Sequence, residues 1–458
     1  MNDQANREQR DTEDAAHPAP ARDILARDRR HVWHPFTQHG TDAEPLPIAG
    51  ARGASLYQAD GGEILDLISS WWTCTHGHSH PKLNEALTQQ AARFEHVMFA
   101  GFTHQPAVDL ATALAQLLPG DLARVFFSDD GSTAVEVALK IAYQYWANRG
   151  EGRRRVFVSF DGGYHGDTLG AMSLGRGSGF FNLFRNIMCQ VAVLPFPYTF
   201  ESDDAADGSE AGALTALEDR LWNGAHDIAA LIIEPLLQGA GGMRMCRPEF
   251  LRRLVEMAQS VGVLVIFDEV ATGFGRTGTL FAMQQAGVVP DLVCLSKGLT
   301  SGYMPMAVTV VRDKVFEGFL GGTFDRALPH GHSFTANPLA CAVALQSLML
   351  FAEEDTLGRV SRIAARHRDL LCALAGRDDV VRPRLLGSIL AFDLKGDAGY
   401  QSAQSQALKA WFLNHGLNIR PLGPTVYLMP PYCITDAELT RAYLGLTDGL
   451  DWLAANRP

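Results

Sequence analysis

The chain has 458 residues, of which 47% are hydrophobic and 20% are charged, an ordinary composition for a globular protein. Its formal net charge of −12 disfavours nucleic acid and anionic membranes as partners, and no apolar run approaches the roughly 20 residues that would span a bilayer. The seven cysteines include no CxxC pair and no zinc-like spacing, so we expect free thiols, no metal and a cytoplasmic location.

Four regions follow one another along the chain. Residues 1–25 are polar and are expected to form a disordered tail, and residues 26–80 an N-terminal arm and strand meander. From 81 to 345, short apolar runs alternate with amphipathic helical stretches, with a polar loop near residues 203–212. This alternation predicts an α/β fold with a mostly parallel central sheet covered by helices. Residues 346–458 are expected to form a smaller α+β domain.

The stretch "DLVCLSKGLTSGYMP" (residues 291–305) contains a short apolar run followed by Lys297. This pattern predicts a buried strand that delivers a lysine to its C-terminal edge. Asp268 likewise follows an apolar run in "GVLVIFDEVATGFGRTG", although a cap or structural ion pair is the alternative for it alone. A desolvated amine and a carboxylate are what pyridoxal phosphate requires, the first for a Schiff base and the second for its ring nitrogen.

A competing motif lies in the same region. The string from Gly273 to Gly278 matches GxGxxG, and Asp291 follows at a distance suited to a ribose. In a dinucleotide site, however, the turn follows its strand directly, whereas "DEVAT" intervenes here. Asp291 also precedes its strand instead of ending it, so we disfavour a dinucleotide site.

Two further strand ends carry groups suited to a phosphorylated ring. In "FFSDDGSTAVEVALKIAYQYW", Gly131 and Ser132 stand between a strand and a helix, whose N-terminus can bind a phosphate. An ordinary helix cap is the alternative. In "FDGGYHGDTLGAMS", Tyr164 and His165 follow another strand, where an aromatic ring can cover a flat cofactor or simply pack within a loop.

Candidate substrate-binding residues lie near both ends of the chain. Trp71 and Trp72, in "SSWWTCTHGHSHP", would point to opposite faces of an extended segment, so that one joins the core while the other lines a pocket. Both could equally belong to the core. Arg420, in "GLNIRPLG", could hold a carboxylate through two hydrogen bonds, or be a surface arginine.

Lys297, Asp268, the Gly131–Ser132 turn and "YHGDT" together resemble class III aminotransferases, the ω-aminotransferase branch of fold-type I pyridoxal-phosphate enzymes. The resemblance runs from about residue 30 to the C-terminus. Within the family, "WHPF", "SSWWTCTHGHSHP", "EPLLQGAGGMRM" and "VYLMPPY" are most similar to members that act in biotin synthesis. This resemblance implies conversion of 8-amino-7-oxononanoate to 7,8-diaminononanoate, with S-adenosylmethionine as amino donor.

The resemblance also assigns roles around the cofactor. Lys297 would hold pyridoxal phosphate as a Schiff base and shuttle a proton, while Asp268 would pair with the ring nitrogen. Tyr164 would stack on the ring with His165 beside it, and the Gly131–Ser132 turn would hold the phosphate.

The remaining implied roles concern the partner subunit and the substrate. The resemblance implies a homodimer with shared active sites, in which His332 and Ser333 belong to the cofactor site and Ser333 reaches the phosphate of the other subunit. Glu234, Arg276 and Tyr427 are implied to support or position the substrate. The residues implied to bind the substrate are Phe36, Trp71, Trp72, Tyr164, Gly331 and Arg420.

Two positions leave the amino donor open. Phe36 stands where members that use S-adenosylmethionine have tyrosine, and His332–Ser333 stands where they have "PT". Both features resemble relatives that use lysine, so lysine stays an alternative donor. A broader ω-amino acid:pyruvate aminotransferase is a second alternative, followed by a non-catalytic cofactor-binding relative and a dehydrogenase.

Overall fold

The computed structural model describes residues 21–176, 181–396, 399 and 402–456. The expected tail lies outside these ranges except for its last five residues, which belong to helix α2 (Ala21–His31). None of the helices in these ranges is long and apolar enough to cross a membrane.

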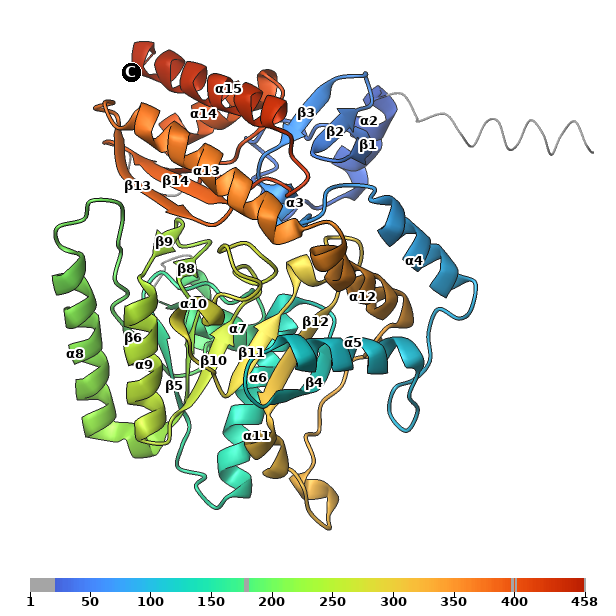
Figure 1. Ribbon diagram of the computed structural model, residues 1–458, viewed down its shortest axis with the longest axis vertical. Coiled ribbons are helices and arrows are strands. Elements are labelled where there is room, and N and C mark those ends of the chain that lie inside the picture. The colour runs from blue at the N-terminus through green and yellow to red at the C-terminus, as the bar shows by residue number, and fades with distance from the viewer. Residues whose placement is uncertain (1–20, 177–180, 397–398, 400–401, 457–458) are drawn as a thin grey trace, which may run out of the picture.

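A seven-stranded sheet forms the centre of the chain, with the strand order β4-β12-β11-β10-β7-β5-β6 (Figure 1). Strand β12 is antiparallel to both of its neighbours, and the other pairings are parallel. The mostly parallel α/β sheet predicted from the alternating apolar runs is therefore confirmed. Its strands are β4 (Leu122–Ser128), β5 (Val156–Phe160), β6 (Val191–Leu194), β7 (Ile228–Ile233), β10 (Leu264–Asp268), β11 (Leu292–Leu295) and β12 (Ala307–Arg312).

The inner strands β7, β10 and β11 are buried on both faces, which explains why their residues are almost all apolar. In β10, Leu264 and Ile266 join one buried cluster, while Val265 and Phe267 join another on the opposite face. The first face is covered by α6 (Gly131–Asn148) and α7 (Leu169–Leu174). The second is covered by α5 (Gln105–Leu117), α8 (Ala206–Gly224), α9 (Pro248–Ser260) and α12 (Pro338–Glu353).

The polar loop expected near residues 203–212 is mostly helix, because α8 begins at Ala206. The helix packs against the core through Leu214, Leu217 and Leu221. Its early turns are fixed by Glu210, whose buried carboxylate accepts hydrogen bonds from the backbone and guanidinium of Arg247. Tertiary contacts thus stabilise a helix where local composition favours a loop.

The N-terminal meander joins the C-terminal part of the chain. Strands β1 (Ile48–Arg52), β2 (Ser55–Gln58) and β3 (Glu63–Asp66) pair antiparallel, and β15 (Leu417–Asn418) adds to β3 in parallel. Figure 1 shows the blue strands beside the orange and red elements. Leu65 of β3 shares a buried cluster with C-terminal residues such as Phe392.

A second antiparallel sheet, of β13 (Val380–Leu386), β14 (Ile389–Leu394) and β16 (Thr425–Leu428), packs with α13 (Thr356–Leu374), α14 (Ala403–Asn414) and α15 (Asp436–Ala455). Helix α12 runs through residue 345, where the sequence predicts the start of the small domain, and the domain limits stay a prediction. The other elements are α3 (Ser69–Trp72), α4 (Pro81–Ala91), α10 (Met283–Ala286), α11 (Asp313–Glu317), η2 (Asn182–Ile187), η3 (Ala225–Asp227), η4 (Lys297–Leu299), η5 (Phe324–Arg326), β8 (Leu237–Gln238) and β9 (Arg244–Met245).

Candidate active site

Two neighbouring strands bring a carboxylate and an amine to the same edge of the central sheet. Asp268 is the last residue of β10 and Lys297 follows the parallel strand β11. Lys297 itself has a φ of 43°, an uncommon conformation for a residue with a side chain, at the point where the chain leaves the sheet. Both side chains line one cavity of about 660 Å³.

The carboxylate of Asp268 is buried and held from two sides. Its Oδ2 lies 2.7 Å from Nδ1 of His165, and its Oδ1 accepts a hydrogen bond of 3.1 Å from the backbone N–H of Val270. Burial alone would lower the pKa of His165, but the hydrogen bond and negative charge of Asp268 outweigh it and raise that pKa. The carboxylate is therefore fixed in direction and remains available on the cavity wall.

The amine of Lys297 lies in surroundings that favour its neutral form. Burial lowers its pKa from the usual value, and the charge of Arg276 acts in the same direction, whereas Asp268 and Glu234 oppose the shift. Its Nζ lies 4.9 Å from the ring centroid of Trp72. A neutral amine is the nucleophilic form that can condense with a carbonyl group.

Glu234 lies on the same cavity wall and binds two backbone amides. Its Oε1 accepts from the N–H of Tyr164 at 3.0 Å, and its Oε2 accepts from the N–H of Gly239 at 2.9 Å. Burial raises the pKa of Glu234 to about 7, even though the positive charge of His165 opposes that rise. The residue thus fixes the loop that carries Tyr164.

The N-terminus of α6 forms another wall of this cavity. Gly131 and Ser132 line it, and the Oγ of Ser132 accepts a hydrogen bond of 3.0 Å from the N–H of Thr168. A Cβ on Gly131 would lie 2.7 Å from a methyl group of Val270, so only glycine fits between the helix and the loop after β10. The helix is capped by Asp130, and not by a serine or threonine as the alternative expected, and the end of the helix also lines the cavity.

Tyr164 stands where this cavity meets a second one of about 350 Å³. Its ring is stacked on Phe181 at 6.2 Å, and burial raises the pKa of its hydroxyl, which therefore stays protonated. Residues that line both cavities include Trp72, Tyr164 and Lys297, so the amine is reachable from both. The second cavity is otherwise lined by Phe36, Trp71, Thr73, Gly162, Asp167, Ala240, Gly241 and Leu422.

The tryptophan pair does not lie in an extended segment, so that expectation was wrong. Ser69, Ser70, Trp71 and Trp72 have φ values of 49°, 44°, 67° and 71°, a left-handed turn built without glycine. Such a conformation costs L-residues roughly 1–2 kcal/mol each, so surrounding contacts must hold it. Trp72 is nevertheless buried while Trp71 is 41% exposed, and both line the second cavity.

Arg276 and Tyr427 support this turn. The indole N–H of Trp72 donates to the hydroxyl of Tyr427 at 3.0 Å. The buried guanidinium of Arg276 donates to the carbonyls of Trp72 at 3.1 Å and Pro430 at 3.0 Å. The implied supporting roles of these two residues therefore have contacts that could carry them.

Aromatic and cationic groups surround the outer side of Trp71. The ring of Phe36 meets the ring of Trp71 edge to face at 5.7 Å. The guanidinium carbon of Arg420 lies 5.4 Å from the Trp71 ring centroid. Phe36, Trp71 and Arg420, which are far apart in sequence, thus form one wall, which we call the Trp71 wall.

Four residues predicted to bind the cofactor or the substrate lie apart from the lining of both cavities: Gly331, His332, Ser333 and Arg420, the last of which lies against Trp71. Gly331 and Ser333 are exposed, and Nδ1 of His332 lies 3.8 Å from the carboxylate of Asp129, which does line the larger cavity. Their roles stay predictions. Asp291 is also elsewhere, because its carboxylate accepts from the N–H of Val265 and pairs with Lys314, as expected for a structural residue.

The cavities also include residues that sequence reasoning did not single out. Thr73 and Asp167 line both, and Thr168 lines the larger one. Thr73 directly follows Trp72, and Asp167 and Thr168 lie two and three residues after His165 within "YHGDT", so these neighbouring positions were the available signal. Leu422 and Gly241 carry no comparable signal, because apolar and small residues are common on any wall.

A mostly parallel sheet with a desolvated lysine beside a buried carboxylate, and a helix N-terminus on the same cavity, defines a fold-type I pyridoxal-phosphate enzyme. The chain matches the profile of the family described as Aminotransferase class-III over residues 36–450, and it belongs to that family. The family is pyridoxal-phosphate dependent, so the chain is an aminotransferase with this cofactor.

Similar proteins agree with this assignment. The adenosylmethionine-8-amino-7-oxononanoate aminotransferase of Synechococcus elongatus is 49% identical over 92% of this chain and 98% of its own. The solved structure of the protein of the same name from Methanocaldococcus jannaschii has a TM-score of 0.88 at 31% identity, covering 93% and 98% of the two chains. An omega transaminase from Pseudomonas jessenii in complex with PMP has a TM-score of 0.88 at 28% identity, covering 94% and 99%.

The groups on the cavity fit the cofactor. The buried amine of Lys297, whose pKa is lowered, suits its aldehyde, and the buried Asp268 suits its ring nitrogen. The backbone at Gly131 and Ser132 suits its phosphate, because it is the N-terminus of α6 and lines the cavity.

Replacing Lys297 with alanine tests the amine. We expect Lys297→Ala to lose its yellow colour and its turnover, by at least about 10³-fold, because no other lysine lines either cavity. Absorbance spectra and steady-state rates measure both effects. Lys395→Ala, at an exposed lysine, is the matched control and should behave as the wild type. Full turnover of Lys297→Ala would contradict the assignment.

The buried carboxyl of Glu234 predicts a pH-dependent stability. Its pKa is about 7 in the folded chain and 4.5 in the reference state, so the folded state binds more protons between these values and loses stability as pH rises. Glu234→Gln has no carboxyl to ionise, so in the apoprotein its folding stability should not fall with pH in this way. The variant should therefore gain roughly 3 kcal/mol relative to the wild type between pH 4.5 and 7.5 in urea unfolding. If the free energies of unfolding of the wild type and the variant changed in parallel with pH, the prediction would be contradicted, because Glu234 would then be ionised in the folded state.

Proposed function

We propose that the chain transfers an amino group from S-adenosylmethionine to 8-amino-7-oxononanoate, giving 7,8-diaminononanoate for biotin synthesis. The relative from Synechococcus elongatus, 49% identical over 92% of this chain, carries the name of this activity. A cytoplasmic location stays a prediction.

The observation that carries the proposal is the shape and chemistry of the second cavity. It opens from Lys297 and is lined by apolar groups, including Phe36, Trp71 and Leu422, which suit an unbranched alkyl chain. Arg420 lies over Trp71 and can meet a terminal carboxylate. A long keto acid would thus meet the amine of Lys297 inside the cavity and, beyond the cavity lining, the guanidinium of Arg420 against Trp71.

The chain's own residues would handle the protons of the reaction. When bound, pyridoxal phosphate supplies an electron sink for the carbon that loses its proton. The Nζ of Lys297, whose pKa burial lowers, can take this proton and return it to a neighbouring position. Asp268, oriented by His165 and Val270, would hold the ring nitrogen of the bound cofactor, while Tyr164 lines the cavity.

The donor is the less constrained half of the reaction. Phe36 lines the second cavity without a hydroxyl, as in relatives that use lysine. One missing neutral hydrogen bond costs on the order of 1 kcal/mol, about tenfold in affinity, which changes a donor site without abolishing it. Lysine therefore stays the alternative donor. The structural likeness to an omega transaminase also keeps a broader ω-amino acid specificity as a second candidate.

Half-reactions with single donors test the proposal. We expect S-adenosylmethionine to bleach the cofactor absorbance of the purified holoenzyme and lysine to leave it unchanged. Phe36→Tyr should strengthen the apparent affinity for S-adenosylmethionine by up to about tenfold, because a hydroxyl is added to the donor site. Stopped-flow absorbance measures both.

Phe324→Tyr is the matched control, since Phe324 is 80% exposed and lines neither cavity. Bleaching by lysine alone would assign the donor to lysine. Bleaching by β-alanine alone would contradict the proposed reaction and favour the broader aminotransferase.

We also propose a homodimer in which Ser333 reaches the phosphate of the other subunit's cofactor. Ser333 and the adjacent Phe334 are exposed, and Phe334 is exposed to 59%. An exposed hydroxyl beside an exposed aromatic ring suits a surface that a second copy covers.

Mixed dimers distinguish this arrangement. Ser333→Ala should weaken cofactor affinity about tenfold, because one hydrogen bond is lost. Refolding Ser333→Ala with Lys297→Ala should restore wild-type affinity in the sites that combine an intact lysine with an intact serine from the other chain. Light scattering gives the mass, and equilibrium dialysis gives the affinity. A monomer, or mixing without recovery, would contradict the shared site.

A further inference from the structure

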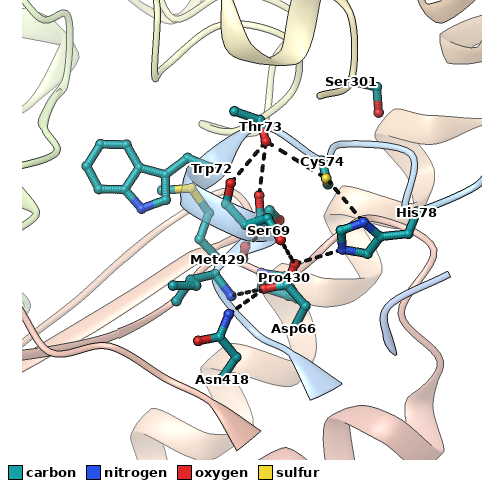
Figure 2. A network of polar contacts seen from close by, with 12 residues as sticks. Asp66, Ser69, Trp72, Thr73, Cys74, His78, Ser301, Asn418, Met429 and Pro430 are labelled. Carbon is teal, nitrogen blue, oxygen red and sulfur yellow. Dashed lines mark hydrogen bonds and ion pairs between the residues drawn. The ribbon is translucent and has the colours of Figure 1, made fainter. Parts of the chain in front are cut away.

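A buried carboxylate lies behind the left-handed turn that carries the tryptophan pair. Asp66, the last residue of β3, has no exposed surface. Figure 2 shows that its two oxygens accept bonds from several directions. Oδ2 accepts from the hydroxyl of Ser70 at 2.8 Å and lies 2.9 Å from Nε2 of His78, while Oδ1 accepts from the amide of Asn418 at 3.0 Å.

These contacts fix the turn at its most strained part. Ser70 has a φ of 44°, and the two tryptophans follow directly. The Ser70 hydroxyl is bound to Asp66, and the Ser69 hydroxyl donates to the carbonyl of Met429 at 2.7 Å. The strained residues are thus bonded to β3 on one side and to the C-terminal part of the chain on the other. Strained backbone of this kind persists only where surrounding contacts hold it in place.

The same carboxylate also holds the strand that leads to Arg420. Asn418 ends β15, which pairs in parallel with β3 so that Asn418 lies opposite Asp66. Two residues further on, the guanidinium of Arg420 lies 5.4 Å from the ring of Trp71. One buried group is therefore bonded to two of the three chain segments that form the Trp71 wall, those of Trp71 and Arg420.

Asp66 and His78 stabilise each other as a charged pair. Burial alone would raise the pKa of Asp66, but its bonds from His78 and Ser70 outweigh it and hold that pKa below the usual range. Burial alone would lower the pKa of His78, yet the bonds to Asp66 and Cys74 raise it to about 10. A buried ion pair of this kind is rigid as long as both partners are present.

We propose that Asp66 and His78 are positioning residues for the substrate: the pair holds the Trp71 wall in place, and Arg420 with it, without touching the substrate. The inference rests on the proposed function for the role of Arg420 at the substrate carboxylate. Cys74 lies 3.6 Å from Nδ1 of His78 but is buried and lines neither cavity, so the arrangement serves as a support and not as a nucleophilic site.

Asp66→Asn in the holoenzyme tests the pair, because it removes the charge and keeps the size. We expect KM for 8-amino-7-oxononanoate to rise at least about tenfold with kcat within about threefold, since the reacting groups are untouched. With the methyl ester of the same substrate, which lacks the carboxylate, KM should change by less than about threefold. His78→Gln should likewise raise KM for the acid with little change in kcat. This variant replaces Asp66→Asn in the test if Asp66→Asn does not fold.

A double-mutant cycle with Arg420→Ala separates positioning from general damage. If Asp66 acts through Arg420, adding Asp66→Asn to Arg420→Ala should leave KM for the acid within about twofold. Asp291→Asn is the matched control, because Asp291 is an equally buried, lysine-paired carboxylate beyond both cavities, and its KM should stay at the wild-type value.

Two results would overturn the inference. One is that the increases in KM caused by Asp66→Asn and Arg420→Ala multiply fully in the double variant. The other is that Asp66→Asn raises KM equally for the acid and for the ester. Failure of the proposed function looks different, because the wild type itself would not use 8-amino-7-oxononanoate. The same cycle would then be run with the carboxylate-bearing substrate that the wild type does use, and the same two results would decide it.

Discussion

The burial of Lys297 at the end of β11 is the constraint on which the rest of the site depends. An amine that leaves water must be paired or neutral, and here burial lowers its pKa while Asp268 and Glu234 only partly restore it. The parallel pairing of β10 and β11 brings Asp268 to the same edge, so the amine and the carboxylate share one cavity. Parallel strands thereby place a pair of groups that neither strand could arrange alone.

The charges around this pair are arranged so that no buried ion is isolated. His165 faces Asp268, Glu234 accepts two backbone amides, and Arg276 is bound to carbonyls. Each group therefore has a fixed direction before any ligand is bound, which is what electrostatic preorganisation requires. The cost appears in Glu234, whose pKa of about 7 shows that burial opposes its ionisation.

The strands of the central sheet and the positions of Lys297 and Asp268 could be predicted because they follow from local patterns. A strand buried on both faces must be apolar, so β10 and β11 were visible as short runs that end in polar residues. The direction of β12 could not be predicted in this way, since an apolar run carries no information about strand direction. The helix at 206–224 could not be predicted from its own residues either, because the contact between Glu210 and Arg247 that holds it lies outside the segment.

The conformation of the tryptophan pair could not be predicted for a related reason. No local rule places Ser70 and Trp71 in a left-handed turn, because non-glycine residues avoid it. The turn exists only because Asp66, Met429 and Arg276 hold it from separate parts of the chain. Strain and long-range contacts of this kind collect at functional sites, where local and global preferences conflict.

The residues around Trp71 bear differently on recognition of the keto acid and on recognition of the amino donor. Phe36, Trp71 and Leu422 offer apolar contacts, which accept any chain of suitable size and discriminate weakly. Directional recognition falls to charged and polar groups such as Arg420, which lies against Trp71 and suits a carboxylate. On the proposed function, this geometry would favour a keto acid with a terminal carboxylate. The choice of donor would then depend on single groups, such as the hydroxyl that Phe36 lacks.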